Sequence, residues 1–193
     1  MIAIVDYGSG NLGSLKKAFD YLGADSKIIS SPKEISGADK IVLPGVGSFG
    51  YMMEQLRKKK IDCAIKGGIL SRKPFLGICL GMQGLFEESE ESAGAKGLGI
   101  FTGKIVKFKR GKVPQIGWNK VKPKPESILQ EGYFYFVNSY YAVPQNPEIV
   151  EATTDYFGDF ASAVRFENIT GVQFHPEKSG KAGLSFLKRW IEC

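Results

Sequence analysis

The first half of the chain alternates between short apolar runs and segments whose apolar residues recur with helical period, and this alternation constrains the fold more than any other feature. The strand-like runs lie at residues 2–5, 26–29, 41–43 and 75–78. Two helical segments lie between them, one with apolar residues at positions 12, 15, 19 and 22 that ends before Gly23, and one that follows Ser48, a candidate cap. Strand–helix–strand alternation predicts a parallel sheet with helices on its faces.

The second half of the chain, after Gly94, consists mainly of short β-rich runs separated by turn signals. These runs lie at residues 104–108, 133–137, 149–154, 161–166 and 171–174. We expect them either to extend the sheet or to form a smaller antiparallel layer beside it. Residues 180–191 are predicted to close the chain as an amphipathic helix with Leu184, Leu187 and Ile191 on one face.

The chain shows no internal repeat and no convincing linker, since the loop-like stretch at residues 120–125 is too short to separate two domains. We therefore predict a single α/β domain over residues 1–193. Its expected architecture is a mostly parallel central sheet flanked by helices, with short antiparallel strands added by the second half.

Composition narrows the possible function classes. Three cysteines, at positions 63, 79 and 193, have neither zinc-site nor disulfide-framework spacing, which favours a reducing, cytoplasmic compartment and predicts no metal. The apolar start gives way at once to Asp6, unlike a signal peptide, and no apolar run approaches the ~20 residues that cross a bilayer. The net charge is +6, but basic and aromatic residues do not interleave as in RNA-reading motifs. We therefore expect neither a membrane nor a nucleic acid as a partner.

The strongest local signal surrounds Cys79. An apolar strand leads into Gly77-x-Cys79-x-Gly81 and then a helix, which is the nucleophile-elbow pattern with cysteine in place of serine. The glycines permit a tight, strained turn in which a side chain would crowd its neighbours. The turn projects Cys79 at the carboxyl end of the sheet, where ligands of open α/β folds bind, and the positive end of the helix favours its thiolate. Cys63 and Cys193 lack this setting and are expected to be buried core residues.

His175 is the one histidine of the chain and the candidate base for Cys79. It follows an apolar strand, so we expect it to emerge from the sheet into a turn that Pro176 stiffens. Glu177 lies two residues further on, where its carboxylate would fix the tautomer of the imidazole. A nucleophile, a base and a group that orients the base form the triad arrangement of covalent catalysis.

A tetrahedral intermediate also needs hydrogen-bond donors for its oxyanion. The backbone N–H of Leu80, directly after the nucleophile, supplies one. The glycine loop at residues 43–49 follows a strand and opens a helix, so it is the candidate source of another. Its spacing matches neither the Walker motif nor the dinucleotide fingerprint, so this role depends on the presence of Cys79 and His175.

In combination, the elbow at residues 77–83, the loop at residues 44–47 and the motif from His175 to Glu177 resemble the triad, or class I, glutamine amidotransferases. Within that group, residues 4–12 and the Gly117-Trp118-Asn119 segment resemble the glutaminase subunits of imidazole glycerol phosphate synthase, which serve histidine biosynthesis. The resemblance covers essentially the whole chain. It implies a flavodoxin-like fold, no cofactor, and hydrolysis of L-glutamine to glutamate and ammonia through a thioester on Cys79.

The resemblance also implies roles for further residues. The N–H groups of Val46 and Leu80 would form the oxyanion hole, with the Val46 peptide turning into place in the active state. Residues that would hold glutamine are Gly47, Gln83, Glu91 and the Asn138-Ser139-Tyr140 stretch. One position departs from the family pattern: many relatives carry a histidine before the Ser-Tyr pair, whereas this chain has Asn138, so a signalling or proton-handling role does not transfer to it.

The same resemblance implies a protein partner, a cyclase subunit with a (β/α)8 barrel that receives the ammonia through an internal channel. Trp118 and Asn119 lie in a stretch expected to be a Gly-Pro-rich loop and are candidate docking residues. The alternative for these two is a buried tryptophan beside a turn asparagine.

Three other functions remain open at this point. Amidotransferase subunits for anthranilate, aminodeoxychorismate, pyridoxal phosphate or guanylate synthesis share the elbow, although residues 4–12 and 117–119 disfavour them. A cysteine peptidase would need a peptide-binding cleft that the sequence does not reveal. A binding module without catalytic activity would retain the fold alone, and the set of Cys79, His175 and Glu177 argues against it.

Overall fold

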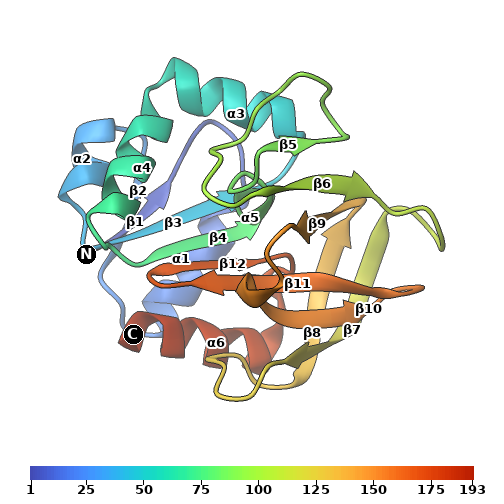
Figure 1. Cartoon of the computed structure of the whole chain (residues 1–193). Helices are drawn as coiled ribbons and strands as arrows, with labels where there is room; N and C mark the ends of the chain where they lie inside the picture. The colour runs from blue at the N-terminus through green and yellow to red at the C-terminus, as the bar shows by residue number, and fades with distance from the viewer.

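The apolar runs of the first half form the parallel part of a 12-stranded sheet in a computed structural model that describes all residues, 1–193 (Figure 1). The parallel strands, in spatial order, are β2 (Ser26–Ile29), β1 (Ile2–Val5), β3 (Lys40–Gly45), β4 (Phe75–Cys79) and β12 (Ile169–Val172). This confirms the predicted parallel core.

The β-rich second half extends this sheet with antiparallel strands. They are β11 (Asp159–Phe166), β10 (Val150–Asp155), β7 (Gln115–Pro123) and β8 (Gly132–Asn138), in that spatial order after β12. A short branch leaves β11 through β9 (Tyr140–Pro144), β6 (Gly103–Lys107) and β5 (Glu88–Ser89). Both expected arrangements therefore occur, since the second half lengthens the sheet and also forms a small side branch.

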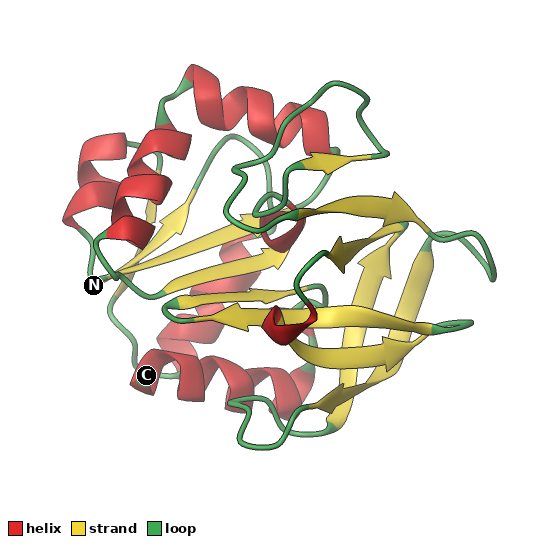
Figure 2. Ribbon diagram, viewed as in Figure 1, coloured by secondary structure: helices red, strands yellow, loops and turns green.

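Helices cover both faces of the parallel part (Figure 2). On one face lie α2 (Pro32–Gly37), α3 (Phe49–Lys58) and α4 (Ile61–Leu70), and on the other lie α1 (Leu12–Tyr21) and α6 (Gly180–Glu192). Successive residues of β1 serve opposite faces, because Ala3 and Val5 pack in the first core and Ile2 and Ile4 in the second. This two-sided burial explains why the parallel strands appear in the sequence as continuous apolar runs.

None of the helices combines the length and the apolar character that a membrane crossing needs.

Some predicted details are wrong. Residues 117–119 and most of the 120–125 stretch are not loops, because β7 runs through Gln115–Pro123 and pairs with β8 and β10. Cys63 and Cys193 are exposed rather than buried. In the last helix, Leu187 is fully buried, but its neighbours in the core are Phe186 and Trp190, with Leu184 and Ile191 only partly buried.

The strand register places the chemically important turns at one edge of the sheet. Gly45 at the end of β3 pairs with Cys79 at the end of β4, and Ile78 pairs with Val172 at the end of β12. The segments that follow these strands therefore emerge side by side.

This register depends on a close contact beneath the elbow. A Cβ added to Gly81, in the helical turn Leu80–Gln83 that follows Cys79, would lie 1.8 Å from the carbonyl oxygen of Leu43 on β3, so even alanine would force this turn away from the strand. We predict that Gly81→Ala lowers the free energy of unfolding by about 3 kcal/mol or prevents folding, as overpacking against backbone does. Urea denaturation followed by circular dichroism measures this.

Gly67 provides the matched control, because it lies inside α4 and a Cβ there would meet no atom within 4 Å. Gly67→Ala should raise the free energy of unfolding by up to ~1 kcal/mol. Equal effects of the two substitutions would contradict the close packing proposed for the elbow.

Candidate active site

Cys79 occupies the strained turn that its glycine neighbours predict. Its backbone has φ 53° and ψ −109°, a left-handed conformation that is rare for a residue with a side chain. The turn joins β4 directly to α5 (Leu80–Gln83), a helix of a single turn. Because α5 is so short, its dipole contributes less to a thiolate than the sequence pattern suggests.

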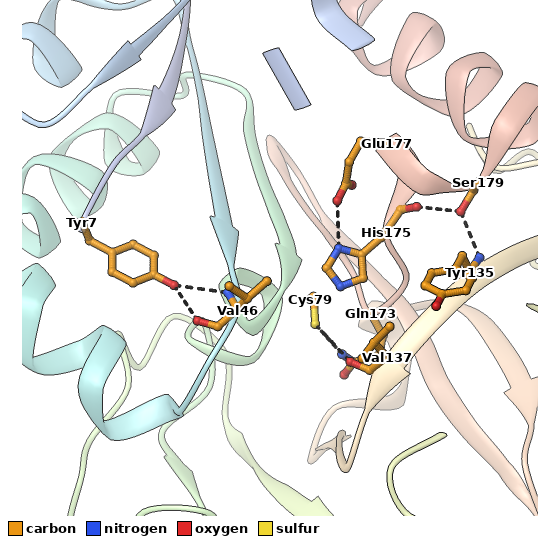
Figure 3. A network of polar contacts seen from close by, with 9 residues as sticks. All are labelled: Tyr7, Val46, Cys79, Tyr135, Val137, Gln173, His175, Glu177 and Ser179. Atoms are coloured by element: carbon orange, nitrogen blue, oxygen red, sulfur yellow. Dashed lines mark hydrogen bonds and ion pairs between the residues drawn. The ribbon is translucent and has the colours of Figure 1, made fainter. Parts of the chain in front are cut away.

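His175 and Glu177 form the contact expected of a base and the group that orients it. The distance from His175 Nδ1 to Glu177 Oε1 is 2.9 Å, and the two side chains are only 5% and 4% exposed. The imidazole lies between the carboxylate and Cys79, with its other ring nitrogen turned toward the sulfur (Figure 3). The predicted triad residues are thus brought together from two separate segments, the elbow that carries Cys79 and the turn that carries both His175 and Glu177.

Hydrogen bonds also fix the position of the His175 backbone. Its N–H donates to the carbonyl oxygen of Tyr135 on β8 at 2.9 Å. Ser179 Oγ donates to the His175 carbonyl oxygen at 2.6 Å and accepts from the Tyr135 N–H at 3.0 Å (Figure 3). The antiparallel extension therefore fixes the position of the candidate base.

Electrostatics favour a charged imidazole. Burial alone would lower the pKa of His175, but the negative charge of the Cys79 thiolate, a hydrogen bond to it and the interaction with Glu177 outweigh burial and raise that pKa from 6.5 to about 10. Because the folded-state pKa lies above the unfolded one, the resulting stabilisation is complete below pH 6.5 and is lost as the pH rises through about 10.

One polar residue that the sequence analysis did not identify, Gln173, contacts Cys79. Gln173 is fully buried, and its Nε2 donates to Cys79 Sγ at 3.6 Å. Its Oε1 accepts from Gln83 Nε2 at 3.0 Å, and the same Nε2 donates to the Tyr140 carbonyl oxygen at 3.0 Å. Gln173 lies two residues before His175 on the same apolar run, and that spacing was the one available signal of its role.

A cavity of about 310 Å³ opens over the cysteine, a volume within the range of small-molecule sites. All of the residues expected to hold glutamine line it, namely Gly47, Gln83, Glu91 and the stretch Asn138, Ser139 and Tyr140. The lining also includes Lys178, to which the sequence assigned no role. The chain forms no cluster of three or more His, Cys, Asp or Glu side chains suited to a metal ion.

Glu91 has a structural contact in addition to its place in the cavity wall. Its Oε2 accepts from the N–H of Phe49, the first residue of α3, at 2.7 Å, and Ser92 Oγ accepts from the Gly50 N–H at 3.0 Å. Ser48 stands at the predicted N-cap position, but its side chain makes no capping hydrogen bond. The helix that follows the glycine loop is therefore capped from the segment that carries Glu91.

The two backbone N–H groups expected to bind the oxyanion differ in whether they already donate to another group. The Leu80 N–H directly follows Cys79, as the elbow pattern requires. The Val46 N–H instead donates to the hydroxyl of Tyr7 at 3.3 Å, although Val46 itself lines the cavity. The Val46 peptide would have to turn before it could donate to an oxyanion.

Trp118 is 56% exposed on β7, so the alternative of a buried tryptophan is wrong. It lies across the strand pair from Tyr135, in edge-to-face contact at 6.0 Å between ring centroids. Asn119 Nδ2 donates to the Asp155 carbonyl oxygen at 2.8 Å, so this side chain is tied to the sheet.

Comparison with known proteins agrees with this geometry. The profile of the family described as "Glutamine amidotransferase class-I" matches residues 3–192. The imidazole glycerol phosphate synthase subunit HisH of Pyrococcus furiosus is 58% identical over 98% of this chain and 97% of its own length. The subunit of the same name from Methanothermobacter thermautotrophicus is 48% identical over 100% of this chain and 98% of its own.

Solved structures with low sequence identity share the fold. The structure of PurLQS from Thermotoga maritima superposes with a TM-score of 0.81 at 17% identity, covering 99% of this chain and 97% of that one. A crystal structure of a glutamine amidotransferase superposes with a TM-score of 0.78 at 18% identity, covering 99% and 100%. With the family profile and the close relatives, these findings lead to one conclusion. The chain is a class-I glutamine amidotransferase and belongs, within that family, to the HisH subunits of imidazole glycerol phosphate synthase.

Proposed function

We propose that this protein is the glutaminase subunit of imidazole glycerol phosphate synthase, and that its single domain hydrolyses L-glutamine to glutamate and ammonia with Cys79, His175 and Glu177. The observation that carries the proposal is the position of the only imidazole of the chain, between the elbow cysteine and a buried carboxylate at the wall of a cavity. A binding module would leave this arrangement unexplained, and a cysteine peptidase would leave the family membership unexplained.

The proposed mechanism follows from the negative charge of the Cys79 thiolate and the positive charge of the His175 imidazolium. The Cys79 thiolate adds to the γ-carbonyl carbon of glutamine, and the carbonyl oxygen becomes an oxyanion. The His175 imidazolium then gives its proton to the departing nitrogen, so ammonia leaves and a γ-glutamyl thioester remains. The neutral imidazole next takes a proton from water, whose oxygen attacks the thioester carbon and releases glutamate and the thiolate. Glu177 keeps the ring oriented through its bond to Nδ1.

The N–H groups of Leu80 and Val46 stabilise the oxyanion in this proposal. Removal of one such donor costs ~3 kcal/mol of transition-state stabilisation, so a chain with Val46 turned away is a slow glutaminase. Gly47, Gln83, Glu91, Ser139 and Tyr140 hold the substrate from the cavity wall, where the carboxylate of Glu91 is complementary to the substrate's ammonium group.

The proposed partner is a cyclase subunit with a (β/α)8 barrel that receives the ammonia directly. Direct transfer preserves the nucleophile, because most free ammonia in neutral water is protonated and ammonium is not nucleophilic. The docking surface we propose is the outward face of β7 and β8, where Ile116, Trp118 and Tyr133 are 56–62% exposed. It reaches the cavity through Val137, which pairs with Ile116 and lines the cavity wall. We place the protein in the cytoplasm, where its three free thiols would remain reduced.

The first test separates nitrogen supply from synthesis. Cys79→Ser should reduce glutamine-dependent synthesis by the complex roughly 10³-fold or more, because the hydroxyl replaces the nucleophile. Ammonia-dependent synthesis should be unchanged, since the variant alters only the nitrogen source. Steady-state assays of the complex with each nitrogen donor measure both.

Cys63→Ser is the matched control, since Cys63 is an exposed cysteine on α4, away from the elbow. It should leave both activities intact. Loss of ammonia-dependent synthesis in folded Cys79→Ser, or survival of its glutamine-dependent synthesis, would contradict the proposal.

The second test concerns docking. Trp118→Ala should weaken binding to the cyclase subunit by at least ~2 kcal/mol if the tryptophan is a hot spot, as measured by titration calorimetry. Tyr21→Ala is the control, because Tyr21 is 79% exposed at the far end of α1, beside the opposite edge of the sheet. Equal affinity for Trp118→Ala, Tyr21→Ala and wild type would exclude the proposed surface.

A further inference from the structure

The hydroxyl of Tyr7 holds both polar atoms of Val46. It accepts from the Val46 N–H at 3.3 Å and lies 3.2 Å from the Val46 carbonyl oxygen, to which it donates. Tyr7 follows the end of β1, its side chain has no exposed surface, and its ring packs in the core shared with α3 and α4. The contact joins residues 39 positions apart and forms part of the fold at the edge where β1, β3 and β4 end.

This contact matters because a backbone N–H makes one good hydrogen bond at a time. While Val46 donates to Tyr7, it cannot donate to an oxyanion on the substrate. Tyr7 lies on one side of Val46 and Cys79 on the other (Figure 3). The N–H must therefore turn from the tyrosine toward the cysteine, which breaks its bond to the hydroxyl.

The local backbone allows this rotation. Val46 lies between Gly45 and Gly47, and Gly47 already has φ +97°, a conformation that side chains disfavour. The pairing of Gly45 with Cys79 anchors the strand just before the peptide that turns. The peptide can thus change orientation while the sheet beneath it remains in register.

We propose that Tyr7 is a positioning residue that latches the Val46 peptide away from the reacting carbonyl, so that release of this latch limits glutamine hydrolysis by the isolated subunit. The inference rests on the proposed function, because it assigns the turned Val46 N–H to the oxyanion of that reaction. The latch operates through the hydroxyl alone, whereas the ring contributes only packing.

The hydroxyl can hold the Val46 peptide throughout the neutral pH range. Burial, partly opposed by the bonds to Val46 and Ser9, raises the pKa of Tyr7 to about 12. The hydroxyl therefore keeps its proton at neutral pH, and its bonds to both Val46 atoms persist. Ser9 Oγ adds a longer contact of 3.4 Å to the same carbonyl oxygen and makes no contact with the Val46 N–H.

Tyr7→Phe tests the latch because it removes the hydroxyl and retains the ring. We expect kcat for glutamine hydrolysis by the isolated subunit to rise roughly tenfold, the equivalent of a lost hydrogen bond, with KM unchanged. The stimulation produced by the ligand-bound cyclase subunit should shrink by the same factor. Ser9→Ala is the control and should leave the basal kcat near the wild-type value, since the Val46 N–H remains bound to Tyr7.

An independent measurement uses the wild-type protein and does not depend on the variant folding. The Val46 amide, followed by NMR hydrogen exchange on the isotope-labelled subunit, should be protected in the isolated chain and should lose protection in the complex with the ligand-bound cyclase subunit before glutamine is added. A freely exchanging Val46 amide in the isolated chain, or an unchanged or reduced basal kcat in folded Tyr7→Phe, would overturn the latch.

Adding Cys79→Ser to Tyr7→Phe distinguishes failure of the latch from failure of the proposed function. Activity that survives in the double variant would refute the role of Cys79 itself. Activity that depends on Cys79 but is not raised by Tyr7→Phe would refute the latch alone.

Discussion

The register of three parallel strands is the constraint on which the rest of the site depends. Gly45 is paired with Cys79 and Ile78 with Val172, so the glycine loop, the elbow and the segment that carries His175 must leave the sheet at one edge. The glycines below the elbow allow this approach, since a Cβ at Gly77 would lie 2.7 Å from the carbonyl oxygen of Gly81. A shift of one residue in either pairing would turn Cys79 toward the opposite face of the sheet.

The site then stabilises charges that burial alone would disfavour. An imidazolium in this setting is sustained by a thiolate on one side and a carboxylate on the other, and Gln173 donates an additional hydrogen bond to the sulfur. The antiparallel extension has a direct part in this, because Tyr135 on β8 anchors the backbone of His175. Cys79 and His175, the proposed nucleophile and base, are thus assembled in advance, whereas the Val46 N–H, the proposed second oxyanion donor, is bound to Tyr7. In this account the resting subunit has a formed triad and an incomplete oxyanion hole.

The sequence predicted those parts of the molecule that depend on local pattern. The parallel strands are apolar runs, the elbow is marked by its glycines, and Glu177 lies two residues from His175. Strand β7 was missed because Gly117, Pro123 and its polar residues have low β propensity, and pairing with β8 and β10 overrides that preference. Cys63 was misjudged although Ile61, Ala64 and Ile65 mark the buried face of α4, which excludes position 63. The bond between Tyr7 and Val46 joins distant segments, and no sequence pattern indicates it.

The central claim is that the Cys79 thiolate and the His175 imidazole form one charged pair, and the single histidine allows this to be measured directly. NMR titration of the imidazole signals should give a pKa near 10 in the wild-type chain, against an ordinary value of 6.5. In Cys79→Ser the pKa should fall, because the negative charge that raises it is gone. An ordinary pKa in the wild-type chain, unaffected by replacement of Cys79, would contradict the account.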